Sequence, residues 1–286
     1  MNTELSGMLV DFFPQLEYIC IKTVAVRRAI EWASIPRRPP GGTRSPVAMS
    51  MLDPAEKKPV RRLITEMVLV FLLFIPFPLY FIPGAVGSTN LTPVQMVVYI
   101  VMAVPQIGIL IYLLTLQKVP LPAFGIKKPR WSSLGWAMIG LGGAFISMFA
   151  VSYASYLLPE GMREVLFKQS PYAITSPAEI PLMVVFCFFV GYREELLFRS
   201  YLIPRLGELG VKPVWAIVGT SLVFGLAHWN QGLLGVAATA LIGASFGVIF
   251  VLRKDLHAVA WGHALYDIGV FLLILVRPYL EQFLKK

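Results

Sequence analysis

Charged residues are scarce in this sequence. Only 14% of its 286 residues are charged and 57% are hydrophobic, whereas a soluble domain is usually about 25% charged and about 45–50% apolar. This composition excludes an ordinary soluble domain and indicates a polytopic membrane protein. The net charge is +9, but the basic residues cluster beside apolar runs, as they do in cytoplasmic loops of membrane proteins. We therefore expect no nucleic-acid partner.

Cysteine and histidine are scarce as well. The chain has two cysteines, Cys20 and Cys187, without a CxxC motif, so neither a disulfide framework nor a thiolate metal site is expected. No HExxH motif is present either, which removes the usual single-helix signature of a zinc protease. The three histidines, His228, His257 and His263, all lie in the last third of the chain.

Long apolar runs dominate the chain after residue 60. They predict an all-α, polytopic membrane bundle of about seven to eight transmembrane helices. The spans are expected at about 63–82, 93–116, 133–158, 181–206, 214–229, 233–252 and 256–276. An eighth short segment could follow the last of these. Residues 1–60 include the run IPRRPPGGTRSP, which cannot continue a helix, and are interpreted as a partly disordered tail.

Basic residues mark one side of the membrane. They precede the first span and recur in the turns after the second, fourth and sixth spans. The positive-inside rule then places the tail and the N-terminus in the cytoplasm. We divide the rest into N-terminal transmembrane helices, 61–176, and a C-terminal core, 177–286.

The fourth span carries an unusual cluster of charges. Arg193, Glu194, Glu195 and Arg199 follow an uncharged stretch from Pro181. If 181–206 is one helix of ~26 residues, it is ~39 Å long and the cluster lies in or near the hydrocarbon. Ionisable groups there are costly and usually functional. In the alternative interpretation, the helix ends at Gly191 and the charges lie in a polar loop.

Helical spacing sorts these side chains by face. Glu195 and Arg199 are four residues apart and can pair, while Glu194 is rotated by about 100° and lacks that partner. A desolvated carboxylate of this kind is a candidate base. Phe224 and His228 also share a face. The third such pair is His263 and Asp267.

The expected depths of these side chains along their helices allow three of them to meet. Glu194 and His228 lie ~21 Å and ~30 Å from the turn near Glu208, and His263 lies ~12 Å into its helix. A shared cavity in the membrane is therefore possible. His257 sits beside a polar turn and points elsewhere, so we interpret it as structural.

The motifs together resemble a known family. Glu194-Glu195-xxx-Arg199, Phe224-xxx-His228 and His263-xxx-Asp267, with EELLFRSYL and FGLAHW around them, resemble the CPBP family of intramembrane proteases over about 178–274. That family includes type II CAAX prenyl endopeptidases and bacterial abortive-infection proteins. The resemblance implies an intramembrane endopeptidase in the plasma membrane of a prokaryote. Its substrate would be a membrane-anchored or lipidated peptide or protein.

The resemblance also implies roles for the residues. Glu194 would activate a water that His228 helps to hold, Glu195 and Arg199 would brace the helix, and His263 with residue 267 would stabilise the oxyanion. Phe224 would be a further supporting residue. The family usually has Asn at position 267. An ionised Asp267 only accepts hydrogen bonds, so it would orient His263 and keep it protonated, or be neutral itself.

Metal dependence has two possible answers. The family has long been described as metalloproteases, and Glu194, His228 and His263 could supply three ligands to a zinc ion. The same residues suffice for a glutamate-activated water without metal, which we favour.

Two other functions compete with the protease. One is a catalytically silent scaffold or bacteriocin-immunity protein that keeps the fold. The other is a solute transporter, which the absence of repeated halves disfavours.

Overall fold

The computed structural model describes residues 60–74, 91–117, 119–166, 174 and 176–284. Residues 58–286 form one compact unit. Helices and turns account for the described residues, without a β-strand, which confirms the all-α prediction. The predicted tail, 1–60, lies outside the described residues except for its last residue.

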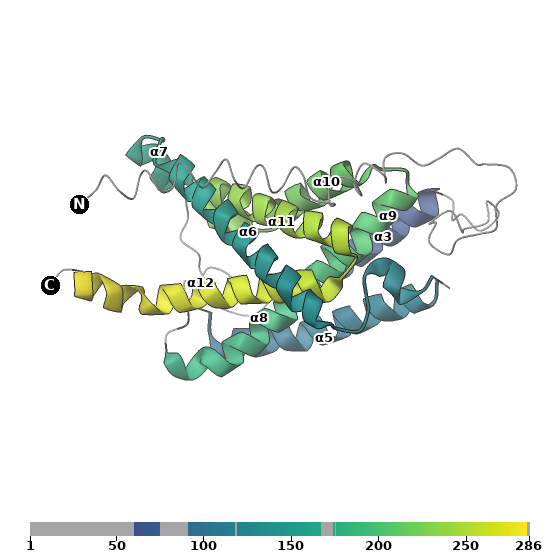
Figure 1. Cartoon of the computed structure of the whole chain (residues 1–286), viewed down its shortest axis with the longest axis horizontal. Helices are drawn as coiled ribbons and strands as arrows, with labels where there is room; N and C mark the ends of the chain where they lie inside the picture. The colour runs from purple at the N-terminus through teal and green to yellow at the C-terminus, as the bar shows by residue number, and fades with distance from the viewer. Residues whose placement is uncertain (1–59, 75–90, 118, 167–173, 175, 285–286) are drawn as a thin grey trace, which may run out of the picture. The chain divides into compact units, whose positions relative to one another are not determined.

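Nine α-helices are described (Figure 1). They are α3 (Val60–Phe74), α5 (Pro93–Thr115), α6 (Trp131–Ser155), α7 (Glu160–Leu166), α8 (Ile180–Glu195), α9 (Ile203–Glu208), α10 (Pro213–Leu226), α11 (Gly232–Arg253) and α12 (Leu256–Leu284). A π-helix, η4 (Leu196–Leu202), joins α8 to α9. Short 3-10 turns are η2 (Leu121–Phe124), η3 (Pro177–Glu179) and η5 (Trp229–Gln231).

Four described helices are long and apolar enough to cross a membrane. They are α5, α6, the stretch Trp229–Arg253 that includes α11, and Leu256–Arg277 of α12. The predicted count of seven to eight spans is not confirmed. The first predicted span is described only as far as Phe74, α10 is a shorter apolar helix, and the fourth predicted span carries the charged cluster. Residues after the seventh predicted span continue α12 to Leu284 rather than forming a separate segment.

Local sequence signals explain several helix ends. Thr92 accepts a hydrogen bond from the backbone of Gln95 and Gln95 reaches back to Thr92, forming a capping box before α5. Lys254 adopts a left-handed conformation, with φ of 48°, and ends α11. Asp255 then accepts hydrogen bonds from the backbone N–H groups of His257 and Ala258 at 3.0 and 3.4 Å. The predicted polar turn is thus a helix stop followed by a helix cap.

α12 is the central element of the packing around the charged cluster. It packs against both α6 and α8, while α11 packs against α6 and α10 (Figure 1). α5 lies against α8. Residues from the charged region of α8 and η4, from α10 and from α12 are thereby brought into one neighbourhood.

Gly191 allows α8 and α12 to approach each other closely. A Cβ atom at this position would lie 2.8 Å from the carbonyl oxygen of Ala260 and 3.2 Å from the nitrogen of Ala264, both backbone atoms of α12. Backbone atoms cannot move aside as a flexible side chain would. The close approach lies one turn before Glu194 and Glu195, so it also sets their distance from α12.

We expect Gly191→Ala to lower the free energy of unfolding by about 1–3 kcal/mol, as overpacking usually does. Gly142→Ala on α6 is the matched control, because its Cβ would meet nothing within 4 Å. Alanine favours a helix over glycine, so the control should be neutral or stabilising. Thermal unfolding in detergent micelles measures both variants, and equal effects would contradict a backbone contact at Gly191.

Candidate active site

The charged cluster lies on a continuous helical stretch. α8, η4 and α9 follow one another without a break from Ile180 to Glu208. The alternative interpretation, in which the helix ends at Gly191, is therefore wrong. The side chains of Arg193, Glu195 and Arg199 are all buried, so the cluster is enclosed by protein and is not a solvated loop.

Glu195 is the centre of a buried hydrogen-bond network. Its Oε1 accepts hydrogen bonds from Arg199 Nη1 and from His263 Nδ1, each at 2.9 Å. Arg199 also donates to the carbonyl oxygen of Gly243 on α11 at 2.9 Å. The predicted Glu195–Arg199 pair is confirmed, and it joins three segments of the bundle.

Glu194 lies beside the same histidine. Its Oε2 is 3.8 Å from His263 Nε2, and this oxygen is buried without a hydrogen-bond partner in the described part of the chain. Asp267 Oδ2 is 3.5 Å from the same Nε2. The imidazole of His263 is therefore surrounded by the carboxylates of Glu194, Glu195 and Asp267. Glu194 and Asp267 thus both lie close to His263, and His263 and Asp267 share a helix face as their spacing predicts.

The hydrogen bonds assign protons to the two histidines. Because an ionised carboxylate only accepts, His263 Nδ1 carries the proton that it shares with Glu195, and its Nε2 faces Glu194 and Asp267. His228 Nδ1 lies 2.8 Å from the carbonyl oxygen of Phe224 and donates to it. In neutral His228, Nε2 then has a lone pair available for an incoming group.

Phe224 connects His228 to the rest of the cluster. Its ring centroid lies 4.8 Å from that of His228 and 5.9 Å from that of His263. The guanidinium of Arg199 lies over the same ring at 4.5 Å. No hydrogen bond or ion pair in the described part of the chain joins His228 directly to Glu194 or His263. Of the three side chains predicted to meet, Glu194 and His263 thus lie side by side. His228 contacts Phe224, which in turn contacts His263.

Both ring nitrogens of His257 form hydrogen bonds in a separate network. Its Nε2 donates to the carbonyl oxygen of Lys127 at 2.7 Å, and its Nδ1 accepts from the hydroxyl of Tyr192 at 2.6 Å. Tyr192 in turn accepts from the indole N–H of Trp261 at 2.7 Å. These contacts join α12 to α8 and to the loop before α6, which confirms the structural interpretation of this histidine.

Sequence reasoning gave no role to Arg193. This buried side chain lies 4.0 Å from Glu194, donates to Gln106 Oε1 at 2.5 Å and also donates to the carbonyl oxygen of Phe74. Gln106 donates to the carbonyl oxygen of Leu73 at 2.7 Å. Arg193 therefore ties the last turn of α3 to α5 and to the helix that carries Glu194. The sequence signal that could have revealed this link is the glutamine within the apolar run of α5.

A comparison with protein families identifies this region. Residues 176–269 match the family described as type II CAAX prenyl endopeptidase Rce1-like. This region is similar to type II CAAX prenyl endopeptidases. All the residues of the cluster, from Arg193 to Asp267, lie inside the match. No curated protein and no solved structure matches the chain.

Of the four helices able to cross a bilayer, the stretch Trp229–Arg253 lies inside the matched region, Leu256–Arg277 begins inside it, and α5 and α6 precede it. The family match and the four helices together indicate an integral membrane protein with a region similar to CAAX proteases.

The donor set of the CAAX endopeptidase-like domain does not fit a zinc ion. Zinc needs three protein ligands within about 2.3 Å of one point. No group of three or more His, Cys, Asp or Glu side chains among the described residues is placed to hold a metal. No hydrogen bond or ion pair in the described part of the chain joins His228 to Glu194 or His263, and both histidines contact the ring of Phe224. The predicted zinc ligands Glu194, His228 and His263 therefore do not form a metal site.

Proposed function

We propose that the chain is an intramembrane endopeptidase in which Glu194 activates a water molecule for attack on a peptide bond. The observation that supports this most is the buried Glu194 oxygen beside His263. That oxygen is 3.8 Å from an imidazole nitrogen and has no hydrogen-bond partner among the described residues. A carboxylate held in this way can take a proton from water.

The proposed reaction has two steps. Glu194 accepts a proton from water as the water oxygen attacks the carbonyl carbon of the substrate, and a tetrahedral oxyanion forms. Glu194 then delivers the proton to the amide nitrogen as the carbon–nitrogen bond breaks. His228 Nε2 accepts a hydrogen bond from the attacking water in this scheme.

His263 is assigned to the oxyanion. In the proposed reaction His263 is an imidazolium, so that its Nδ1–H donates to Glu195 and its Nε2–H donates to the developing charge. A positioned donor of this type contributes about 3–4 kcal/mol to transition-state stabilisation. Asp267, 3.5 Å from Nε2, orients the imidazole and balances its charge. Glu195 and Arg199 position His263 and do not touch the substrate.

The proposed substrate is a membrane-anchored or lipidated peptide or protein. A scissile bond must reach a cluster that lies among membrane helices, and an anchored chain is already concentrated at that depth. We also propose the plasma membrane of a prokaryote as the location. The distribution of basic residues supports an N-terminus in the cytoplasm.

The test is cleavage of a membrane-anchored peptide by the purified protein in liposomes, with the products identified by mass spectrometry. We expect His228→Gln to reduce the rate by about 10²-fold or more, the usual range for a group that handles a proton or its water. Because the proposed ligands do not form a metal site, a chelator should leave the rate unchanged. Loss of activity with chelator, restored by zinc, would refute the metal-free reaction.

The same assay separates the enzyme from a silent scaffold. If wild type and His228→Gln both release product only at the rate of empty liposomes, across a set of anchored peptides, the endopeptidase proposal is wrong and a scaffold or immunity role is favoured.

A further inference from the structure

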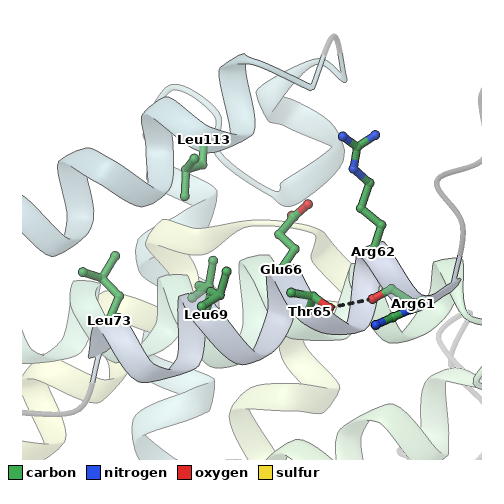
Figure 2. Close-up of a pocket in the computed structure, with 8 residues that line it drawn as sticks. Arg61, Arg62, Thr65, Glu66, Leu69, Leu73 and Leu113 are labelled. Carbon is green, nitrogen blue, oxygen red and sulfur yellow. Dashed lines mark hydrogen bonds between the residues drawn. The ribbon is translucent and has the colours of Figure 1, made fainter.

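A groove of about 840 Å³ lies along α3, away from the candidate active site (Figure 2). α3 forms one wall, and Leu113 of α5 faces it from the other side. None of the catalytic residues proposed above lines this groove.

The two ends of the groove differ in polarity. Arg61, Arg62 and Glu66 line one end, and Leu69 and Leu73 line the other. Figure 2 shows Arg62 and Glu66 projecting from α3 toward the side on which α5 lies. Arg62 and Leu73 are separated by ~17 Å along the helix axis. This length is close to the ~15 Å of one leaflet of a bilayer's hydrocarbon core.

The polar end has an excess of positive charge. Glu66 Oε1 lies 3.3 Å from Arg205 Nη2 and accepts hydrogen bonds from Tyr201 and Gln117 at 3.1 and 2.8 Å. Arg205 also pairs with Glu208 at 2.6 Å, so the two carboxylates share one guanidinium, and Arg61 and Arg62 leave the polar end with a net positive charge. Arg61 and Arg62 are exposed, and neither forms an ion pair within the described part of the chain. Two guanidinium groups without an ion-pair partner among the described residues therefore lie where the apolar wall of the groove begins.

We propose that this groove binds one anionic phospholipid. Its phosphate contacts Arg61 and Arg62, since guanidinium groups match phosphate oxygens in geometry and charge. One acyl chain lies along Leu69, Leu73 and Leu113, where it covers apolar surface. The positive-inside distribution puts these arginines at the cytoplasmic leaflet, which is the leaflet with the negative surface potential.

Native mass spectrometry of the full-length protein tests the proposal. The protein is released from mixed micelles that contain phosphatidylglycerol and phosphatidylcholine in equal amounts. We expect wild type to retain phosphatidylglycerol preferentially. The double variant Arg61→Gln/Arg62→Gln should lose about 30-fold in the affinity for phosphatidylglycerol, from the usual attraction of two basic residues to anionic lipid. Leu73→Trp should weaken the binding of both lipids, because the larger side chain narrows the apolar end of the groove.

The matched control removes two exposed charges elsewhere. Lys128→Gln/Lys212→Gln has the same net charge as the arginine variant, and both lysines are exposed. If the affinity of this control for phosphatidylglycerol falls as much as that of the arginine variant, the attraction is a general effect of surface charge and the groove proposal is wrong. It is also wrong if inorganic phosphate at millimolar concentration displaces the lipid, since an anion site alone would then explain the binding.

Discussion

Replacement of Glu194 by glutamine is expected to reduce peptide hydrolysis by about 10³-fold, within the 10²–10⁴-fold range that general bases contribute. Glutamine keeps the size of the side chain and can still accept a hydrogen bond, but it cannot take a proton from water. The nearby Arg193 and His263 contacts, at 4.0 and 3.8 Å, are too long for the fold to depend on them. The initial rate on a membrane-anchored peptide measures the effect, and thermal unfolding checks that the variant is folded.

Glu160→Gln provides the control for this change. Glu160 is an exposed carboxylate on α7, so its replacement removes the same charge outside the cluster and should leave the rate unaltered. A folded Glu194→Gln variant with a rate within threefold of wild type would show that another group activates the water.

Replacement of Arg199 by methionine is expected to destabilise the protein by about 3–5 kcal/mol, as is usual when one partner of a buried ion pair is removed. The change would leave Glu195 buried with His263 as its hydrogen-bond partner and would leave the Gly243 carbonyl without its guanidinium donor. Arg199 is 1% exposed and Glu195 0%, so water cannot replace the lost contacts. Thermal unfolding in micelles, with and without added lipid, measures the loss.

Arg163→Met is the matched comparison for Arg199. Arg163 pairs with Glu160 at 3.9 Å, and their side chains are 31% and 82% exposed. Exposed pairs of this kind contribute about 0–1 kcal/mol, so the control should unfold near the wild-type temperature. Equal destabilisation of the two variants would mean that the Glu195–Arg199 pair does not stabilise the bundle.

The long apolar runs and the four-residue spacings were readable in the sequence. The second, third and sixth predicted spans correspond to α5, α6 and α11, whose ends differ from the predicted ones by no more than a few residues. The Glu195–Arg199 pair followed from helix geometry alone, because both residues belong to one helical stretch. Motif order also led to the family that the comparison found.

Contacts between helices were not readable in the same way. Spacing fixes which face of a helix a side chain occupies, but not how that helix is rotated against its neighbours. The hydrogen bond from His263 to Glu195 and the contacts of Phe224 with two histidines depend on that rotation. Arg193 also contacts α3 and α5, which lie far away in the sequence. The π-helix at Leu196–Leu202 has no recognisable sequence signal.

Because of that π-helix, the contacts that follow Glu194 and Glu195 depend on the exact number of residues in this segment. Its turns are closed by i→i+5 hydrogen bonds, so each turn contains more residues than a turn of a regular α-helix. Deleting or inserting a single residue within Leu196–Leu202 would turn Arg205 by about 100° relative to Glu194. Arg205 would then point away from Glu66 on α3. This segment should therefore accept side-chain substitutions far more readily than insertions or deletions.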